Sequence, residues 1–213
     1  ELVFGLKKLN KVASASQAKG ASCAVIMPAH NEERGISDAV TALRKVAPEG
    51  VRIIVVADNC DDGTAQLAIA AGAEAIVRKN AELRGKGFAL AFGRDFLALD
   101  PPDAVVVLDA DCRLAQGSIE TLVAAALNTG RPAQALDVIS PDLTLQPLVQ
   151  ISSFAFLVKN VARLRGLTRL GGCSVLCGTG MAFPWQVFAS APLATGNVVE
   201  DLGLAITLIR QGC

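Results

Sequence analysis

The chain has 213 residues, of which 52% are hydrophobic and 19% are charged. This composition excludes a disordered chain, and the length suits one sizeable α/β domain or two small ones. Lys plus Arg and Asp plus Glu number 20 each, so the net charge is zero and gives no reason to expect a nucleic-acid partner.

The sequence gives little support for a membrane-spanning or secreted protein, or for one stabilised by disulfides or zinc. No run of about 18 uncharged apolar residues is present to form a membrane-spanning helix, and no signal peptide is recognisable. The six cysteines form no CxxC pair, which favours reduced thiols in a cytosolic setting over a disulfide framework or a zinc site. Residues 1–20 combine a basic amphipathic stretch with a linker, so we expect the folded domain to begin at residue 21.

Strand-like and helix-like patterns alternate after this lead. In chain order the apolar spacing predicts strand 23–28, helix 33–47, strand 51–58, helix 64–72, strand 73–79, helix 86–99, strand 104–110, helix 118–128, strand 133–139, helix 147–165, strand 173–184 and helix 197–212. This alternation predicts an α/β fold with a Rossmann-like, mostly parallel central sheet flanked by helices on both faces.

Apolar spacing also predicts which helix faces are buried. The expected inward residues are Ile36, Ala39, Val40, Leu43 and Val46, then Phe88, Ala91, Phe92, Phe96 and Leu99, then Leu148, Ile151, Phe154, Ala155 and Val158, and finally Leu202, Ala205, Ile206 and Ile209. Basic residues Lys159, Arg163, Arg165 and Arg169 follow the third set and form either a solvated face or a contact for an acceptor or a membrane.

Polar side chains follow each of the first four predicted strands. In order along the chain they are His30, Asn31 and Glu32, then Asp58, then Arg84 and Lys86, then Asp109 and Asp111. Because ligands bind at the carboxyl ends of parallel strands, we expect these four clusters to share one rim of the sheet.

The pair Asp109 and Asp111 ends the fourth strand, with no Lys or Arg between the two carboxylates. Mg²⁺ and Mn²⁺ take oxygen ligands, commonly one or two carboxylates together with phosphate oxygens. A polar turn explains the same pattern, so the pair alone leaves both interpretations open. Asp58 is likewise either a solvated loop acid or an acceptor of hydrogen bonds from a base or sugar, since it comes too early to cap the next helix.

Two other segments carry candidate chemistry. The segment RGKG (84–87) places Arg84 and Lys86 among glycines before a helix, which suits a diphosphate but is a weak motif alone. Asn197 and Glu200 fit a capping box at the start of the last helix. Asp201, in the first turn of that helix, would be held ionised by the helix dipole and could act as a general base.

Six motifs stand in a characteristic order: PAHNEE (28–33), VVADNCDDGT (55–64), RGKG (84–87), VVVLDAD (105–111), CGTGMAFP (177–184) and VVED (198–201). Together they resemble the family 2 inverting glycosyltransferases with the GT-A fold, and most of all the membrane-associated branch with cellulose-synthase-like and exopolysaccharide enzymes. The resemblance covers about residues 21–212. It divides the domain into a nucleotide-sugar half, 21–115, and an acceptor half, 116–213.

The resemblance implies transfer of a sugar from a nucleoside-diphosphate sugar, in most relatives a UDP-sugar, to an acceptor hydroxyl with Mg²⁺ or Mn²⁺ as cofactor. The acceptor would be a glycan or a lipid-linked molecule in polysaccharide or glycolipid synthesis. It further implies a full-length protein anchored to the membrane and placed at its cytoplasmic face. A segment Q-x-x-R-W found in processive relatives is missing, so we expect a catalytic domain truncated at its C-terminal end.

The resemblance also implies site roles. The implied nucleotide-sugar contacts are Pro28, Ala29, His30, Glu32, Asp58, Arg84, Lys86, Asp109 and Ala110. Asp111 and Asp109 are the implied metal ligands, with Asp111 the more direct of the two. Gly178, Thr179 and Gly180 would lie on the acceptor side, and Asp201 in the Glu200-Asp201 pair would be the catalytic base.

Other functions remain as alternatives. A non-catalytic nucleotide-sugar-binding or regulatory domain would carry the same pocket. A sugar nucleotidyltransferase would need a Gly-rich, Arg-containing loop after the first strand, and a dehydrogenase would need G-x-G-x-x-G; the sequence has neither.

Overall fold

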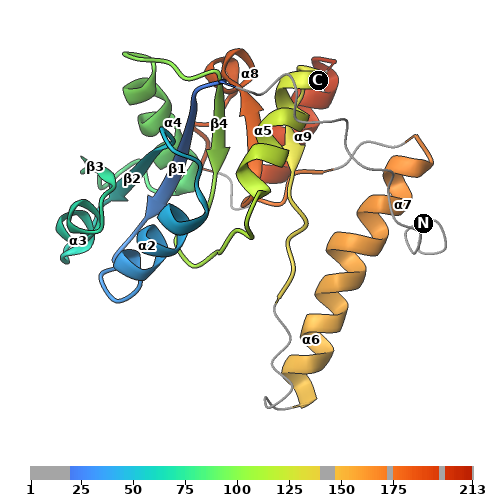
Figure 1. Ribbon diagram of the computed structural model, residues 1–213, viewed down its shortest axis with the longest axis horizontal. Coiled ribbons are helices and arrows are strands. Elements are labelled where there is room, and N and C mark those ends of the chain that lie inside the picture. The colour runs from blue at the N-terminus through green and yellow to red at the C-terminus, as the bar shows by residue number, and fades with distance from the viewer. Residues whose placement is uncertain (1–19, 140–146, 172–174, 197–199, 213) are drawn as a thin grey trace.

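The computed structural model describes residues 20–139, 147–171, 175–196 and 200–212. A six-stranded sheet with the order β3-β2-β1-β4-β6-β5 forms its centre (Figure 1). The strands are β1 (Cys23–Ala29), β2 (Arg52–Asp58), β3 (Glu74–Arg78), β4 (Ala104–Val107), β5 (Ala133–Gln134) and β6 (Met181–Pro184). Strands β1 to β4 pair in parallel, and β6 runs antiparallel to both β4 and β5. The predicted mostly parallel sheet is therefore confirmed.

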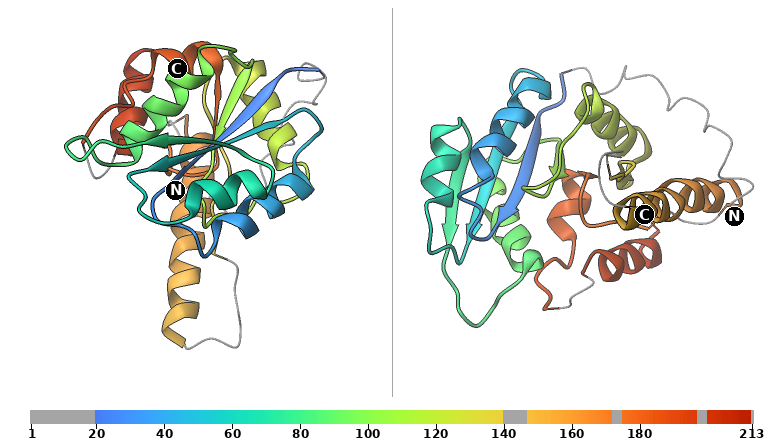
Figure 2. Two further views of the ribbon diagram at one scale, coloured as in Figure 1. Left: turned by 90° about the vertical axis from the view of Figure 1, so that its left-hand side faces the viewer. Right: turned by 90° about the horizontal axis from the view of Figure 1, so that it is seen from below.

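Helices cover both faces of this sheet (Figure 2). One face packs on α2 (Ile36–Val46), α3 (Thr64–Ala70) and α5 (Ser118–Thr129), and the other on α4 (Lys86–Leu97), α8 (Trp185–Ser190) and α9 (Glu200–Arg210). Along β1, Val25 and Met27 join the first core and Ala24 and Ile26 the second. All four are fully buried, which explains why the strands are apolar at every position rather than alternating.

Three predicted strands are much shorter in the structure, while those predicted over 51–58 and 73–79 lose only one and two residues. Strand β4 ends at Val107 rather than residue 110, β5 covers only two residues of the predicted 133–139, and β6 begins at Met181 rather than residue 173. Side chains take part in the backbone bonding beyond these strands: the Asp109 amide donates to Thr179 Oγ1, and the Cys177 amide donates to Gln134 Oε1.

The buried face of α2 agrees with the prediction, whereas in α4 only Ala91 of the predicted set is buried. The other residues of α4 that pack against the sheet are Ala89, Leu90, Gly93 and Leu97. Phe92 is exposed. A Cβ on Gly93 would come within 3.1 Å of Val56 and 3.3 Å of Ile26, so the small residues let the helix approach the strands. Phe88 and Phe96 lie at the margin, under the guanidinium groups of Arg78 and Arg52, and Leu99, beyond the end of the helix, is exposed.

The predicted inward face of α9 is also wrong. Leu204, Ala205 and Leu208 are buried, so only Ala205 of the predicted set points inward, while the other three are exposed: Leu202, Ile206 and Ile209. The face of α9 that packs on the sheet therefore differs from the one that its apolar spacing predicts.

The largest departure concerns the helix predicted over 147–165. It is a continuous helical run built from α6 (Pro147–Leu157), the π-helical η1 (Val158–Arg163) and α7 (Leu164–Arg169). Its first part extends away from the sheet (Figures 1 and 2). The residues expected to point inward are exposed, namely Leu148, Ile151, Phe154 and Ala155, with Val158 half-buried. None of the helices in the described ranges combines the length and the hydrophobicity of a membrane-spanning segment.

Candidate functional site

A pocket of about 440 Å³ opens at the carboxyl ends of the parallel strands. We call it the strand-end pocket, and it is lined by Pro28, Ala29, His30, Glu32, Asp58, Asn59, Arg84, Gly85, Lys86, Ala89, Asp109, Ala110 and Asp111. The structure thus brings together all nine residues predicted to contact a nucleotide sugar and both predicted metal ligands. Three lining residues were not predicted: Asn59, Gly85 and Ala89.

The loops after β1 and β2 shape one wall of the strand-end pocket by bonding to each other. The Glu32 amide donates to Thr64 Oγ1 at 2.8 Å, and the Asp61 amide donates to Asn31 Oδ1 at 2.9 Å. Nδ1 of His30 donates to the Asp58 carbonyl at 2.8 Å. Thr64 is fully buried, so its hydroxyl holds the Glu32 loop in place and the conformation of one loop depends on the other.

Asp58 is held by a buried ion pair that the sequence analysis missed. Arg78 donates to Asp58 Oδ1 at 2.6 Å, and the two side chains are 9% and 11% exposed. The residues are register partners on the parallel strands β2 and β3. Arg78 also donates to the Leu83 carbonyl at 2.7 Å and packs over Phe88. One side chain therefore joins Asp58, the loop before Arg84 and the start of α4. Its position at the end of a predicted strand, in the same rim as Asp58, was the available signal.

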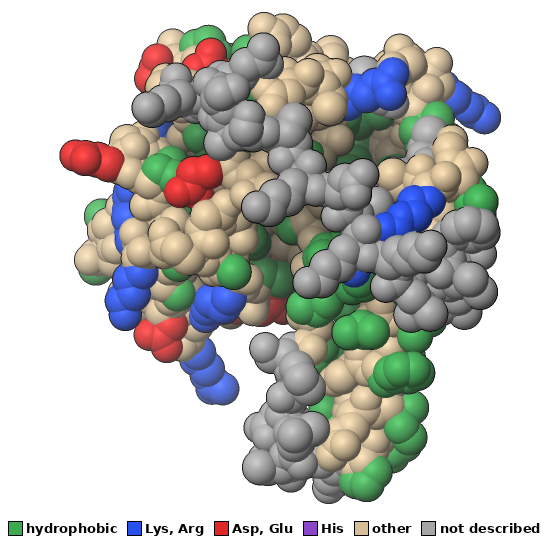
Figure 3. Space-filling model, turned by 45° about the vertical axis from the view of Figure 1, so that its right-hand side comes forward, with side chains coloured by type: hydrophobic (Ala, Val, Ile, Leu, Met, Phe, Trp, Pro, Cys, Tyr) green, Lys and Arg blue, Asp and Glu red, His purple; other side chains and the backbone are tan. Residues whose placement is uncertain are grey.

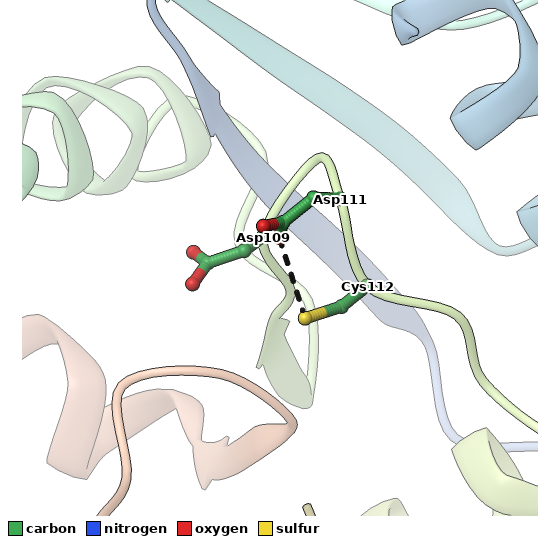
Figure 4. A group of neighbouring side chains, drawn as sticks. All are labelled: Asp109, Asp111 and Cys112. Atoms are coloured by element: carbon green, nitrogen blue, oxygen red, sulfur yellow. Dashed lines mark hydrogen bonds between the residues drawn. The ribbon is translucent and has the colours of Figure 1, made fainter. Parts of the chain in front are cut away.

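The carboxylates that follow β4 lie in a tight turn (Figure 4). The Cys112 amide donates to the Asp109 carbonyl at 3.1 Å, so the turn suggested by the sequence is present. The Asp109 amide leaves the sheet and donates to Thr179 Oγ1 at 3.0 Å. Potential ligand atoms of Asp109, Asp111 and Cys112 lie within 4.8 Å of one another. The turn and the metal-site interpretations are therefore compatible.

The chemistry of this cluster fits a hard cation. Burial raises the pKa of the Cys112 thiol, and the Asp111 charge adds to this rise, whereas a hydrogen bond with Thr179 opposes it. The protonated thiol donates to Asp111 Oδ1 at 3.5 Å, so it is a poor soft-metal ligand. Two carboxylates remain as the oxygen donors that Mg²⁺ and Mn²⁺ prefer.

Lys86 connects the strand-end pocket with the other half of the chain. Its ammonium group pairs with Asp109 and donates to the Gly178 carbonyl at 2.8 Å. Together with Gly178 and Asp201 it also lines a smaller cavity beside the main pocket. A Cβ placed on Gly178 would lie 3.4 Å from Asp201 Oδ2 and 3.6 Å from Lys86 Nζ. Asp201 thus lies next to the predicted diphosphate lysine, while Asn197 and the Glu200 side chain fall outside the described residues.

Gln134 on β5 holds the predicted acceptor loop, and no sequence pattern marks this residue. Its Oε1 accepts from the Cys177 amide at 2.8 Å, and its Nε2 donates to the Thr179 carbonyl at 2.8 Å. Gly180 has a positive φ of 63°, and a Cβ there would meet Ala135 at 2.8 Å. Only glycine fits both the conformation and the space.

Asp137, in the loop after β5, is a further residue that the sequence did not predict. Burial raises the pKa of its carboxyl group, and the negative charge of Asp109 adds to the effect. Asn160, which is 3% exposed, donates to Asp137 Oδ2 at 3.3 Å from the π-helical turn. The middle of the helical run 147–169 therefore lies beside Asp137, whose charge interacts with that of Asp109.

An α/β sheet with these groups gathered at its strand ends defines a ligand-binding α/β protein whose site suits a metal and an anionic ligand. The family model described as Glycosyl transferase family 2 matches residues 24–188, so the chain belongs to glycosyl transferase family 2.

Individual relatives agree with this assignment. Uncharacterized glycosyltransferases of Mycobacterium bovis and Mycobacterium tuberculosis are 33% identical over 117 residues, which is 53% of this chain and 49% of theirs. The chain thus spans about half the length of the curated relatives it matches. Among solved structures, glucosyl-3-phosphoglycerate synthase from M. tuberculosis in complex with uridine diphosphate is 26% identical, with a TM-score of 0.62 over 96% of this chain and 72% of that one.

The same synthase has also been solved with Mn²⁺, UDP-glucose and phosphoglyceric acid. That structure is 26% identical to this chain, with a TM-score of 0.60 over 92% of this chain and 68% of the synthase. The likeness therefore extends over most of this chain.

Proposed function

We propose that the protein is a metal-dependent inverting glycosyltransferase that moves a sugar from a UDP-sugar to an acceptor hydroxyl. The observation that carries this proposal is the convergence of four strand ends on one pocket with two carboxylates and Lys86 at its rim. Binding of UDP, UDP-glucose and Mn²⁺ by the structurally similar synthase supports the choice of donor and cofactor.

Residues 21–115 form the donor half in this proposal. Asp58, oriented by Arg78, accepts hydrogen bonds from the nucleoside, and the stretch from Pro28 to Glu32 lines it. Arg84 and Lys86 face the diphosphate at the start of α4, where the helix terminus adds a favourable potential for an anion.

Asp109 and Asp111 would hold Mg²⁺ or Mn²⁺. The bound cation supplies charge neutralisation for the diphosphate leaving group. Lys86 supports the same task from the protein side, because its ammonium group already lies between Asp109 and the Gly178 loop. Growth of negative charge on the leaving group is thus met by a positive group that needs little rearrangement.

Asp201 is the proposed general base in the acceptor half, residues 116–213. It takes the proton from the acceptor hydroxyl, whose oxygen bonds to the anomeric carbon as the bond to the diphosphate breaks. Attack from the opposite face inverts the configuration in one displacement. Gly178, Thr179 and Gly180 form the neighbouring loop on the acceptor side, and the proximity of Gly178 to both Lys86 and Asp201 supports this arrangement.

The proposed acceptor is the hydroxyl of a glycan or of a lipid-linked molecule in polysaccharide or glycolipid synthesis. We further propose that the full-length protein works at the cytoplasmic face of a membrane. The resemblance of the ordered motifs to the membrane-associated branch supports both statements, as does the basic lead with Lys7, Lys8 and Lys11.

The test compares Asp201→Asn with Asp38→Asn, a matched control because Asp38 occupies the first turn of α2 and is exposed. Hydrolysis of a panel of UDP-sugars is measured with Mn²⁺, together with UDP affinity. We expect Asp201→Asn to lower turnover by about 10²–10⁴-fold while UDP affinity is unchanged. Equal turnover in both variants would remove Asp201 as the base, and a wild type that binds UDP without any turnover would favour a binding domain.

A further inference from the structure

Helix α6 carries apolar side chains on all sides and buries none of its residues. Leu148 is 74% exposed, Ile151 63% and Phe154 68%, and Leu157 and Val149 are also exposed. Figure 3 shows hydrophobic side chains gathered on the projecting part of the molecule. A helix that is apolar all round is normally buried in a core or a membrane. An exposed apolar surface of this kind marks a docking site.

The charge pattern beside α6 is one-sided. Between residues 143 and 199 the sequence has no Asp or Glu, and its only charged residues are Lys159, Arg163, Arg165 and Arg169. All four lie in η1 and α7, which continue α6 toward the body of the protein. Segments that insert at an anionic lipid surface typically combine an apolar part with neighbouring positively charged residues.

We propose that α6 docks the protein onto an anionic phospholipid bilayer. The apolar tip enters the boundary between headgroups and acyl chains, and the exposed basic residues Lys159 and Arg163 lie nearest the lipid phosphates. With 11 residues, α6 is about 16 Å long, which is too short to cross a hydrocarbon core of about 30 Å. A protein partner would cover one stripe of the helix, whereas lipid chains can surround all of its sides.

Docking by α6 would orient the site. Asn160, in η1 directly after α6, donates to Asp137, and Asp137 is close enough to Asp109 for their charges to interact. The acceptor side of the strand-end pocket would therefore face the lipid surface, within reach of hydroxyl groups carried there. This inference rests on the proposed membrane location, but it does not depend on sugar transfer.

The test is co-sedimentation with vesicles of phosphatidylcholine alone and of phosphatidylcholine with phosphatidylglycerol. The variant is Ile151→Ser with Phe154→Ser, and the matched control is Ile69→Ser with Leu99→Ser, whose residues are 58% and 84% exposed elsewhere on the surface. We expect the wild type and the control to bind anionic vesicles, with binding weakened by salt. The α6 variant should lose about tenfold or more in partitioning. All three proteins should bind UDP equally.

Three outcomes would overturn the inference: a wild type that stays in the supernatant with both vesicle types, an α6 variant that binds as well as the control, or a dimer that the α6 variant dissolves without any vesicle binding. UDP titration separates these from a failure of the proposed function, because loss of UDP binding in the wild type would count against the donor site and leave vesicle binding unaffected.

Discussion

The two halves of the molecule position their functional side chains by different means. In residues 20–115 the parallel strands β1 to β4 deliver polar groups to one rim, and register alone places Asp58 opposite Arg78. In the acceptor half the strands are short, and Gln134, Thr179 and Asn160 hold loops through long-range hydrogen bonds. The difference teaches that a strand end fixes a side chain through backbone pairing, whereas a loop needs a dedicated polar partner.

The largest expected effect on stability concerns residues 20–115, where strand register positions the side chains. Arg78→Met leaves the buried Asp58 carboxylate unpaired, so we expect a loss of about 3–5 kcal/mol in the free energy of unfolding. The matched variant Arg52→Met breaks the Arg52–Glu74 pair between the same two strands, where the side chains are 28% and 43% exposed. That loss should stay below about 1 kcal/mol. Urea unfolding measures both, and equal losses would show that burial at the rim contributes nothing.

An intermediate effect on stability is expected in the acceptor half, where polar contacts hold the loops. Gly180→Ala adds a Cβ within 2.8 Å of Ala135 at a residue with φ of 63°. Gly130→Ala is the control, since φ is 64° there and nothing lies within 4 Å. The control should lose about 1–2 kcal/mol from backbone strain alone. Gly180→Ala should lose a further 1–3 kcal/mol, roughly, from overpacking. Chemical unfolding measures the loss of stability in both variants. Equal losses would show that the loop around Gly180 shifts to accommodate the added methyl group.

The smallest effect concerns Asp137, whose raised pKa means that the folded chain holds its proton to higher pH than the unfolded chain does. Its contribution to stability is present below the unfolded pKa of about 4 and is lost as pH rises through the folded pKa. Asp137→Asn cannot ionise, so its stability relative to wild type should increase from pH 3 to pH 7, by less than about 0.5 kcal/mol.

Unfolding of Asp137→Asn and wild type across this pH range, without added metal, provides the measurement. Asp38→Asn, which removes an exposed carboxylate from the first turn of α2, serves as the control for the loss of one charge. A relative stability of Asp137→Asn that falls toward neutral pH would contradict the raised pKa that burial and the Asp109 charge give to Asp137.

Sequence patterns predicted the first half well because its determinants are local. The apolar run of β1, the period of α2 and the polar residues after each strand are all visible in the chain, and parallel topology then brings His30, Asp58 and Asp109 together. The family motifs added Asp201, which no local pattern distinguished from a helix-dipole residue.

The features that were missed depend on tertiary contacts. The face of α4 follows Gly93, because close approach to Val56 and Ile26 outweighs the apolar area of Phe92. Gln134 lies in a two-residue strand, and its role depends on a loop more than 40 residues away. Helix α6 broke the rule that apolar spacing predicts an inward face, since the described part of the protein offers it no core. Such a conflict between local pattern and burial points to an external partner.

The most direct measurement is calorimetric titration of UDP with and without Mn²⁺ for the wild type, Asp111→Asn and Asp95→Asn. Asp95 is an exposed control on α4 whose carboxylate pairs with its neighbour Arg94. We expect Mn²⁺ to tighten UDP binding in the wild type and in Asp95→Asn, and this gain to disappear in Asp111→Asn. UDP binding that is independent of Mn²⁺ in the wild type, or an undiminished gain in Asp111→Asn, would contradict the assignment of the strand-end pocket as a metal-dependent nucleotide-sugar site.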